Sequence, residues 1–358
     1  MFIAIMAGGS GTRFWPASRK NLPKQFLSLC SSKPLIYETF LRVASLVDEE
    51  KIFLIINRRH RSLVDQIFKG HHLRIIEEPD ERNTAPCIGL VSLWIEKEFG
   101  DQPIAILPSD HYIANTEAFQ QTLLAGMDFV KEEGIVMLGA IPNYPETGYG
   151  YLERGESISS SQGVSVYKVK RFIEKPDMEK AKAYLASQNF YWNMGIFIFR
   201  PRTMLSQIAL HLPELGKGLS KIRESIGSDR YPTVLEEVYS SISSISIDYG
   251  VMEKTSEKIF LIPGQFGWSD VGSWNALFRF KEADKDLNGN LVQGKVILVD
   301  TKDSFVYSKN GRLIGVLGLK DTLIVDTEDV LLISNLQRSQ ELRQFPEILR
   351  KRGWKQWV

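Results

Sequence analysis

Short apolar runs alternate with longer segments of helical periodicity through the first two-thirds of the chain. Runs such as Phe2–Met6 and Ile52–Ile56 have the length of buried strands, and Leu35–Val47 and Ala85–Phe99 carry apolar residues at helical spacing. Further strands are expected at residues 73–76, 103–107 and 135–138, and further helices at residues 62–68 and 117–133. Strands separated by helices are typical of βαβ units with right-handed crossovers. The sequence therefore predicts an α/β fold with a mostly parallel sheet flanked by helices.

The pattern changes from about Asn288 onward. Short strand-like runs follow one another with little room for helices, at residues 296–299, 305–307, 313–317, 323–325 and 330–333. Asp303 and Asp321 stand near the starts of two of these runs, as turn residues would. A helical tail interrupted by Pro346 follows. We expect the chain to divide into residues 1–285 and residues 286–358, the second being a small β-helix-like domain with a helical tail.

Composition excludes several classes of protein. The 358 residues allow two or three domains, and a net charge of +1 gives no field that would favour nucleic acid or an anionic membrane. Cys30 and Cys87 are far apart and form no CxxC pair, which argues against a disulfide framework and a zinc site. No apolar run approaches the ~20 residues of a membrane span, and the N-terminus lacks the cationic start of a signal peptide. We expect a cytoplasmic protein without nucleic-acid or membrane partners.

A glycine-rich segment, Gly8-Gly9-Ser10-Gly11-Thr12-Arg13, directly follows the first predicted strand. It is not a Walker A loop, because no Gly-Lys-Ser/Thr closes it, and the dinucleotide-binding GxGxxG pattern fails at Phe14. A plain glycine turn that closes the strand is one interpretation. Arg13 and Lys24 favour another, since a guanidinium fork and a mobile ammonium both suit phosphate groups. The segment is a candidate polyphosphate-binding loop.

Two aspartates in separate loops are candidate metal ligands. Asp110 comes just after the predicted strand at residues 103–107, and Asp270 lies in the aromatic and glycine-rich segment Gly267–Trp274. Two carboxylates together with substrate phosphates are a common ligand set for Mg²⁺. Each aspartate could equally cap a helix or form an Asx-turn, and the sequence does not show that the two meet. His111 is interpreted as a structural histidine.

A second anion-binding site is indicated further along the chain. The segment Phe172–Pro176 ends a strand with an acid–base pair before proline, and Pro145–Tyr151 combines glycines with tyrosines. Tyr191–Gly195 places an asparagine between aromatic residues at the entrance to a strand at residues 196–199. Aromatic rings and amides of this kind suit recognition of sugar hydroxyls. Core aromatics with ordinary turns remain the alternative for each stretch.

Taken together, these segments resemble the sugar-1-phosphate nucleotidyltransferase family, and in particular its mannose-1-phosphate guanylyltransferase branch. The matching stretches are AGGSGTRFWPASR, PKQF, EPDERNTAP, LPSDH, PETGYGY, FIEKP, WNMGIF, IDYGVMEK and GWSDVGSW, in order from residue 7 to residue 274. The resemblance implies a Rossmann-like mixed, mostly parallel sheet of the GT-A type, followed by a left-handed β-helix-like segment. Phe14, Ala17 and Met194 depart from the commonest family pattern, which affects fine substrate preference rather than the reaction.

The resemblance also implies roles for individual residues. Arg13, Lys24, Asp110 and Lys175 would be the catalytic residues, and Asp110 and Asp270 would hold Mg²⁺. The nucleotide would be bound by a first group: Gly8, Gly9, Gly11, Thr12, Arg13, Lys24, Asn83, Ser109 and Asp110. The sugar phosphate would be bound by a second group: Gly150, Glu174, Lys175, Asn193 and Asp248.

The implied reaction is transfer of GMP from GTP to mannose 1-phosphate, which gives GDP-mannose and pyrophosphate with the help of Mg²⁺. The family also implies a homodimer. It includes a long form with an added isomerase domain, and the sequence predicts no such activity for this chain. Two alternatives stay open: a transferase for another nucleotide and sugar phosphate, and a sensor that binds a nucleotide sugar without catalysis. A nicotinamide-dependent Rossmann enzyme is disfavoured, because the glycine fingerprint and the acidic ribose contact are missing.

Overall fold

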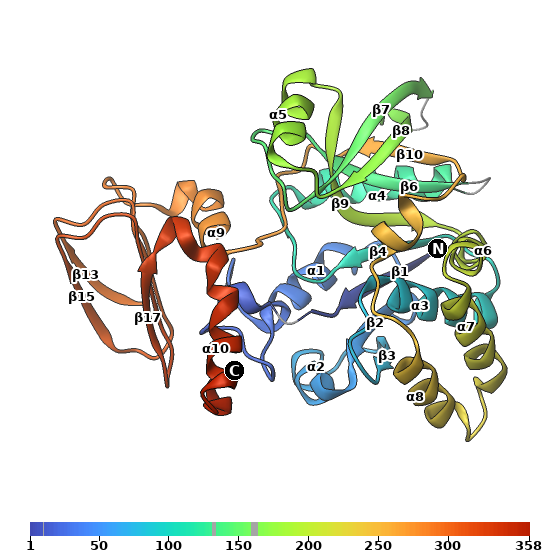
Figure 1. The fold of residues 1–358 in the computed structure, drawn as a ribbon, viewed down its shortest axis with the longest axis horizontal. Helices are drawn as coiled ribbons and strands as arrows, with labels where there is room; N and C mark the ends of the chain where they lie inside the picture. The colour runs from blue at the N-terminus through green and yellow to red at the C-terminus, as the bar shows by residue number, and fades with distance from the viewer. Residues whose placement is uncertain (10, 131–133, 159–163) are drawn as a thin grey trace. The chain divides into compact units, whose positions relative to one another are not determined.

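The computed structural model describes residues 1–9, 11–130, 134–158 and 164–358, which form two compact units (Figure 1). Ser10 of the glycine loop and the predicted helical residues 131–133 lie outside the described residues. The first unit comprises Met1–Gly8, Tyr37–Ser109 and Ile113–Trp268, and the second comprises Gly9–Ile36, Asp110–Tyr112 and Ser269–Val358. The two units therefore interleave along the sequence, and the division of the chain at residues 285 and 286 stays a prediction.

In the described part of the first unit, nine strands form one mixed sheet in the order β3-β2-β1-β4-β9-β6-β10-β8-β7. The strands are β1 (Phe2–Ala7), β2 (Ile52–Asn57), β3 (Arg74–Glu78), β4 (Ile104–Pro108), β6 (Ile135–Ala140), β7 (Gly150–Ile158), β8 (Val166–Glu174), β9 (Phe190–Phe199) and β10 (Ile259–Pro263). Parallel pairing joins β1 to β2 and β4, β2 to β3, and β6 to β10. Strand β9 runs antiparallel between β4 and β6. The predicted α/β fold is confirmed.

Helices cover both faces of this sheet, because successive side chains of a strand point to opposite sides. Phe197, Met137 and Leu261 belong to a core that also holds side chains of α3, α6, α7 and α8. The neighbouring Ile198 and Val136 face Gly126 of α4. The helices are α2 (Arg61–Ile67), α3 (Thr84–Phe99), α4 (Thr116–Phe129), α5 (Met178–Ser187), α6 (Pro201–His211), α7 (Pro213–Ser225) and α8 (Tyr231–Ser241). In Figure 1, α6, α7 and α8 follow one another down one side of this unit.

The second unit contains the predicted β-helix-like part. Its strands are β12 (Leu291–Gln293), β13 (Lys295–Val299), β14 (Phe305–Ser308), β15 (Leu313–Leu317), β16 (Thr322–Asp326) and β17 (Leu331–Asn335). Strand β14 pairs in parallel with β12 and β16, and β13 pairs in parallel with β15, so successive coils stack on one another. Asp303 and Asp321 adopt left-handed backbone angles, with φ of 49° and 51°, in the turns between coils. The predicted β-helix-like architecture is confirmed.

The C-terminal tail differs from its prediction in one respect. A 3₁₀ helix, η7 (Leu336–Gln344), leads directly into α10 (Phe345–Lys351), and Pro346 occupies the first turn of α10. A first-turn residue needs no intrahelical N–H bond, so proline is tolerated there. Pro346 therefore starts a helix instead of interrupting one. Short elements complete the unit: η1 (Thr12–Phe14), η2 (Lys24–Phe26), α9 (Trp274–Phe280), η6 (Glu282–Asp284) and η8 (Lys355–Trp357).

Other short elements connect these parts of the chain. α1 (Leu35–Val43), β5 (Tyr112–Ile113) and β11 (Trp268–Ser269) each begin in one unit and end in the other. The remaining turns, all in the first unit, are η3 (Glu49–Lys51), η4 (Arg58–His60) and η5 (Asp248–Met252). Within the described ranges, no helix is both long enough and apolar enough to cross a bilayer.

Glu78, the last residue of β3, is a carboxyl group buried in the core of the first unit. Its Oε1 accepts a hydrogen bond from the Tyr239 hydroxyl at 2.9 Å, and the Cys87 thiol lies beside it. Burial raises the pKa of Glu78 to about 7, although the hydrogen bonds from Tyr239 and Cys87 oppose the shift. Folding therefore favours the protonated form, which is neutral and costs less to bury.

This raised pKa predicts that stability falls as the pH rises. The contribution of protonated Glu78 is complete below its unfolded pKa of 4.5 and is lost progressively until the pH passes about 7. We expect Glu78→Gln to remove this dependence. Between pH 5 and pH 8 the free energy of unfolding of wild type should therefore fall by about 2 kcal/mol more than that of the variant. Urea denaturation at both pH values measures the difference. Equal changes in the two proteins would show that Glu78 ionises normally.

Candidate functional site

The glycine loop packs directly against Lys24 in the second unit. Gly11 has a φ of 58°, and a Cβ at this position would lie 2.4 Å from the Lys24 Cβ and 2.8 Å from the Lys24 backbone nitrogen. Only glycine fits so close an approach with this backbone angle. Thr12 and Arg13 follow immediately in η1, and Gly9 is also left-handed, with a φ of 95°. Glycine at position 11 is therefore required by its close packing against Lys24, and the binding role of the loop stays a prediction.

Lys24 joins the two predicted metal-binding aspartates. Its Nζ donates to Asp110 Oδ2 at 2.7 Å and to the backbone oxygen of Asp270 at 2.6 Å, and its side chain is only 7% exposed. The Asp270 carboxylate also accepts a hydrogen bond from Gly272 N at 3.0 Å, so the Asx-turn that the sequence left open is present. The structure thus brings together three residues that are 86 and 160 positions apart in sequence.

These residues line one cavity of about 400 Å³ in the second unit. Its walls are Gly11, Thr12, Arg13, Phe14, Lys24, Asp110, His111, Asp270, Gly272 and Arg343. Arg13 and Arg343 are exposed, and neither has an ion-pair partner among the described residues. Three basic side chains and two acidic side chains therefore line the same cavity. The cavity has the charge of an anion-binding site.

The ionisation of Asp110 fits a role as a metal ligand. Burial alone raises the pKa of this carboxyl, but the charges of Lys24 and His111 and the hydrogen bond from Lys24 outweigh it, so the pKa lies below 3.8. Asp110 is thus an anion at neutral pH. Asp110 and Asp270 line the same cavity, and Mg²⁺ commonly needs only one or two carboxylates when phosphates complete its ligands. The donor set of the cavity fits a hard divalent cation.

A second group of predicted residues meets in the first unit, at the paired ends of β7 and β8. Gly150 lies opposite Glu174, and a Cβ on Gly150 would come within 2.5 Å of Glu174 Oε2. The Glu174 carboxylate forms an ion pair with Lys175 and is only 7% exposed, whereas the lysine side chain is half exposed. Burial lowers the pKa of Lys175, but the hydrogen bond and charge of Glu174 outweigh that effect and raise it above 10.5. The ammonium group of Lys175 is therefore accessible to solvent, while the Glu174 carboxylate that pairs with it is buried.

Asn193 and Asp248 extend this group. Asn193 Nδ2 donates to Asp248 Oδ1 at 3.0 Å. Burial and the negative charge of Glu174 raise the pKa of Asp248 to about 6. Asn193 lies inside β9 and not in a turn before it. The strand predicted at residues 196–199 therefore begins earlier, at Phe190. The reason is Gly195, whose φ of 65° and hydrogen bond to Asn193 Oδ1 allow the strand to continue through an irregularity.

The other predicted nucleotide-binding residues of the first unit have structural partners or lie at an exposed end. Asn83 has a φ of 68° and caps α3 by accepting from Thr84 N at 2.8 Å, while its side chain stays exposed. Ser109 is buried, and its backbone carbonyl accepts a hydrogen bond from the Thr39 hydroxyl. Gly8 is exposed just after β1. Their assignment to the nucleoside stays a prediction.

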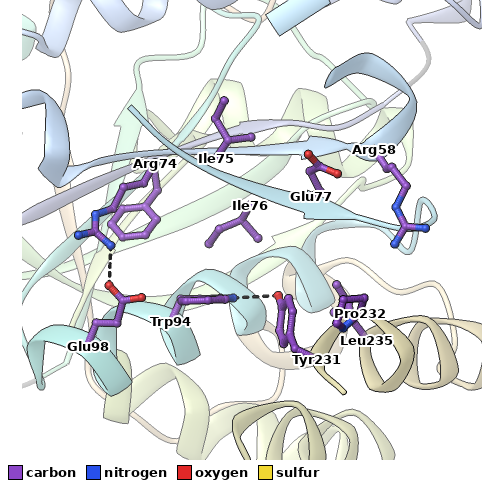
Figure 2. A pocket seen from close by; sticks show the side chains of 11 residues that line it. Arg58, Arg74, Ile75, Ile76, Glu77, Trp94, Glu98, Tyr231, Pro232 and Leu235 are labelled. Atoms are coloured by element: carbon purple, nitrogen blue, oxygen red, sulfur yellow. Dashed lines mark hydrogen bonds and ion pairs between the residues drawn. The ribbon is translucent and has the colours of Figure 1, made fainter. Parts of the chain in front are cut away.

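Another cavity, of about 420 Å³, lies beside the edge strand β3 and contains none of the predicted site residues (Figure 2). Trp94 donates to the Tyr231 hydroxyl at 3.0 Å within it. Its arginines are both neutralised: Arg74 pairs with Glu98 at 2.5 Å and Arg58 pairs with Glu236 at 2.8 Å. This cavity therefore offers no spare positive charge to an anion, unlike the cavity around Lys24.

Sequence reasoning missed two residues at these sites. Arg343 lies in the polar helical tail, outside every motif, and nothing in its local sequence indicates a binding residue. Glu253 accepts a hydrogen bond from Glu174 N at 3.0 Å. It belongs to the segment IDYGVMEK that carried the resemblance, so that segment offered a signal for it.

Comparison with known proteins gives matches over nearly the whole chain. The family model described as nucleotidyl transferase matches residues 3–286, and the model described as mannose-P isomerase/GMP-like β-helix domain matches residues 294–349. The chain is 37% identical over 352 residues to mannose-1-phosphate guanylyltransferase of Klebsiella pneumoniae, with 97% of this chain and 73% of that protein covered. It is 35% identical over 359 residues to mannose-1-phosphate guanylyltransferase of Escherichia coli strain K12, with 99% and 74% covered.

Solved structures include a similar protein of nearly the same length. A crystal structure from Thermus thermophilus, described as a mannose-1-phosphate geranyltransferase, is 33% identical to this chain and superposes with a TM-score of 0.86. The match covers 98% of this chain and 99% of that one. The likeness therefore includes both the sheet with its helices and the β-helix-like part.

Proposed function

Because this chain belongs to the mannose-1-phosphate guanylyltransferase family of nucleotidyltransferases, we propose that it transfers GMP from GTP to mannose 1-phosphate. A phosphate oxygen of mannose 1-phosphate attacks the α-phosphorus of GTP and forms the new P–O bond. The bond from the α-phosphorus to the oxygen that bridges to the β-phosphate breaks, and pyrophosphate leaves. The observation that carries this proposal is the cationic cavity in which Lys24, Asp110 and Asp270 meet.

The residues of that cavity suit the triphosphate. Arg13 offers a guanidinium fork without a carboxylate partner among the described residues, and Lys24 supplies a buried ammonium. Both charges would stabilise the negative charge that collects on the departing pyrophosphate. Gly11, Thr12 and Gly9 would leave backbone groups close to the phosphates, as glycine loops commonly do.

Nucleotidyltransferases of this family generally use a divalent metal ion, and we propose Mg²⁺ held by Asp110 and Asp270. The low pKa of Asp110 supports this assignment, because a metal ligand has to be deprotonated. The ion would supply positive charge that offsets the repulsion between the two phosphate-bearing substrates. Lys24 already holds the Asp110 carboxylate in place by its hydrogen bond.

The residues of the first unit suit mannose 1-phosphate. Lys175 would bind the sugar phosphate, and Glu174, Asn193 and Asp248 would contact sugar hydroxyls beside Gly150. The nucleophilic phosphate is already an anion near neutral pH, so the chemistry needs no general base. Binding of two anions is a main requirement, and the cationic side chains of each unit suit it.

We further propose that the chain works in the cytoplasm as a homodimer. The outer face of the β13–β15 pair supports the proposed homodimer, because four apolar side chains are exposed there: Ile297, Val299, Leu313 and Leu317. Apolar side chains gathered on one face are typical of a protein–protein interface.

Pyrophosphate release tests the reaction and its substrates. The purified protein is incubated with Mg²⁺ and with every combination of GTP, ATP, UTP or dTTP and mannose 1-phosphate or glucose 1-phosphate. We expect release mainly from GTP with mannose 1-phosphate. Release from another pair would keep the reaction and change the substrate. No release from folded protein that still binds nucleotide would point to a nucleotide-sugar sensor.

A further inference from the structure

We infer that Arg343 of the C-terminal tail is part of the triphosphate-binding site and contacts the terminal phosphates of the nucleotide. The inference rests on the proposed function, in that it assigns a nucleoside triphosphate to the cavity around Lys24. Arg343 lines that cavity together with Arg13, Lys24 and Asp110, although it is 330 residues from Arg13 in the sequence. Arg343 lies outside every motif that the sequence offers.

The tail that carries Arg343 is fixed to the segment that carries Arg13. Trp15, two residues after Arg13, stacks on Phe345, two residues after Arg343, with ring centroids 4.7 Å apart and planes at 10°. The indole N–H of Trp15 donates to the Trp357 carbonyl at 2.8 Å. The preceding Leu342 is buried in the core of the second unit. The position of Arg343 is therefore set by packing.

The charge and exposure of Arg343 indicate what it binds. With Arg13 and Lys24 it gives the cavity three cations against the carboxylates of Asp110 and Asp270. It is exposed and has no ion-pair partner among the described residues, whereas Lys24 is buried and paired. An exposed guanidinium that lines the cavity suits the more highly charged end of a triphosphate, which it can hold with two parallel hydrogen bonds.

Nucleotide binding without any sugar phosphate tests this role. Isothermal titration measures the affinity of wild type and Arg343→Ala for GTP, GMP and inorganic tripolyphosphate. We expect the variant to lose about tenfold or more in affinity for GTP and tripolyphosphate, as for removal of a charged hydrogen bond. The affinity for GMP should stay within about twofold, because GMP lacks the phosphates that Arg343 contacts.

Matched variants separate binding from structure. Arg350→Ala, an exposed arginine of α10 that does not line the cavity, should bind all three ligands like wild type. Arg343→Lys should recover part of the loss, since it keeps the charge without the fork. Wild-type affinity of Arg343→Ala for tripolyphosphate would overturn the inference, and so would an equal loss for GMP and GTP, which would indicate a structural role.

The outcomes also separate this inference from the proposed function. If wild type transfers no GMP but Arg343→Ala still weakens tripolyphosphate binding, the proposed reaction fails and the phosphate contact stands. If wild type is active and Arg343→Ala binds GTP normally, the reaction stands and the contact fails. If wild type binds neither GTP nor tripolyphosphate, both are wrong.

Discussion

Lys24→Met is expected to lower kcat by about 10²–10³-fold, the loss typical when one preorganised electrostatic group is removed from an active site. The variant keeps most of the side-chain volume and removes the charge. Two effects combine: the departing pyrophosphate loses a cation, and Asp110 loses the partner that holds its carboxylate at 2.7 Å. Initial rates of pyrophosphate release at saturating GTP and mannose 1-phosphate measure the change.

Controls for Lys24→Met have to separate chemistry from folding, because removing one partner of a mostly buried ion pair also destabilises a protein. Thermal unfolding of the variant gives the structural part of the effect. Lys24→Gln provides a second variant, whose amide can still donate to the Asp270 carbonyl without carrying charge. Lys33→Met, at an exposed position of the same segment, should keep the wild-type rate. A folded Lys24→Met protein with a wild-type kcat would remove Lys24 from the catalytic residues.

The sequence predicts best what depends on local patterns. Strand β1 and helix α3 were expected almost at their observed bounds, because apolar runs and helical periodicity report burial directly. Gly11 was predicted from its neighbours to belong to a polyphosphate-binding loop; the structure shows its left-handed backbone packed against Lys24, and the binding role stays a prediction. Local pattern was misleading at Asn193, because an asparagine between aromatic residues and a glycine resembles a turn. The left-handed backbone of Gly195 lets strand β9 continue through this position.

The site depends on contacts that no local pattern encodes. Asp110 and Asp270 each look like ordinary turn residues, and only the fold brings them to the same lysine. Arg343 is the extreme case, since its place in the cavity depends on the packing of Trp15 against Phe345. Glu78 shows the same limit for electrostatics, because its raised pKa follows from burial beside Tyr239 and Cys87. The pairing of Asp110 with Asp270 was predicted only from the family resemblance. The place of Arg343 in the cavity became visible only in the tertiary structure.

Lys175→Met is expected to reduce kcat/KM for mannose 1-phosphate by about 10²–10³-fold, with little change in the affinity for GTP. The half-exposed ammonium of Lys175 is positioned by Glu174 and by a left-handed backbone with a φ of 47°. Its removal takes away the cation that would bind the sugar phosphate. Initial rates at varied mannose 1-phosphate, together with titration of GTP alone, measure the two expectations.

A titration distinguishes a binding role of Lys175 from a structural one. The charge of Lys175 opposes the burial and the Glu174 carboxylate that raise the pKa of Asp248 to about 6. Without that charge the pKa of Asp248 should rise further, so the pH dependence of mannose 1-phosphate affinity should shift to higher pH in Lys175→Met and not in Lys175→Arg. Lys180→Met, an exposed lysine of α5 paired with Asp177, is the matched control and should behave like wild type. If Lys175→Met binds mannose 1-phosphate as tightly as wild type and titrates in the same pH range, the sugar phosphate is held elsewhere, and the first unit needs a different binding residue.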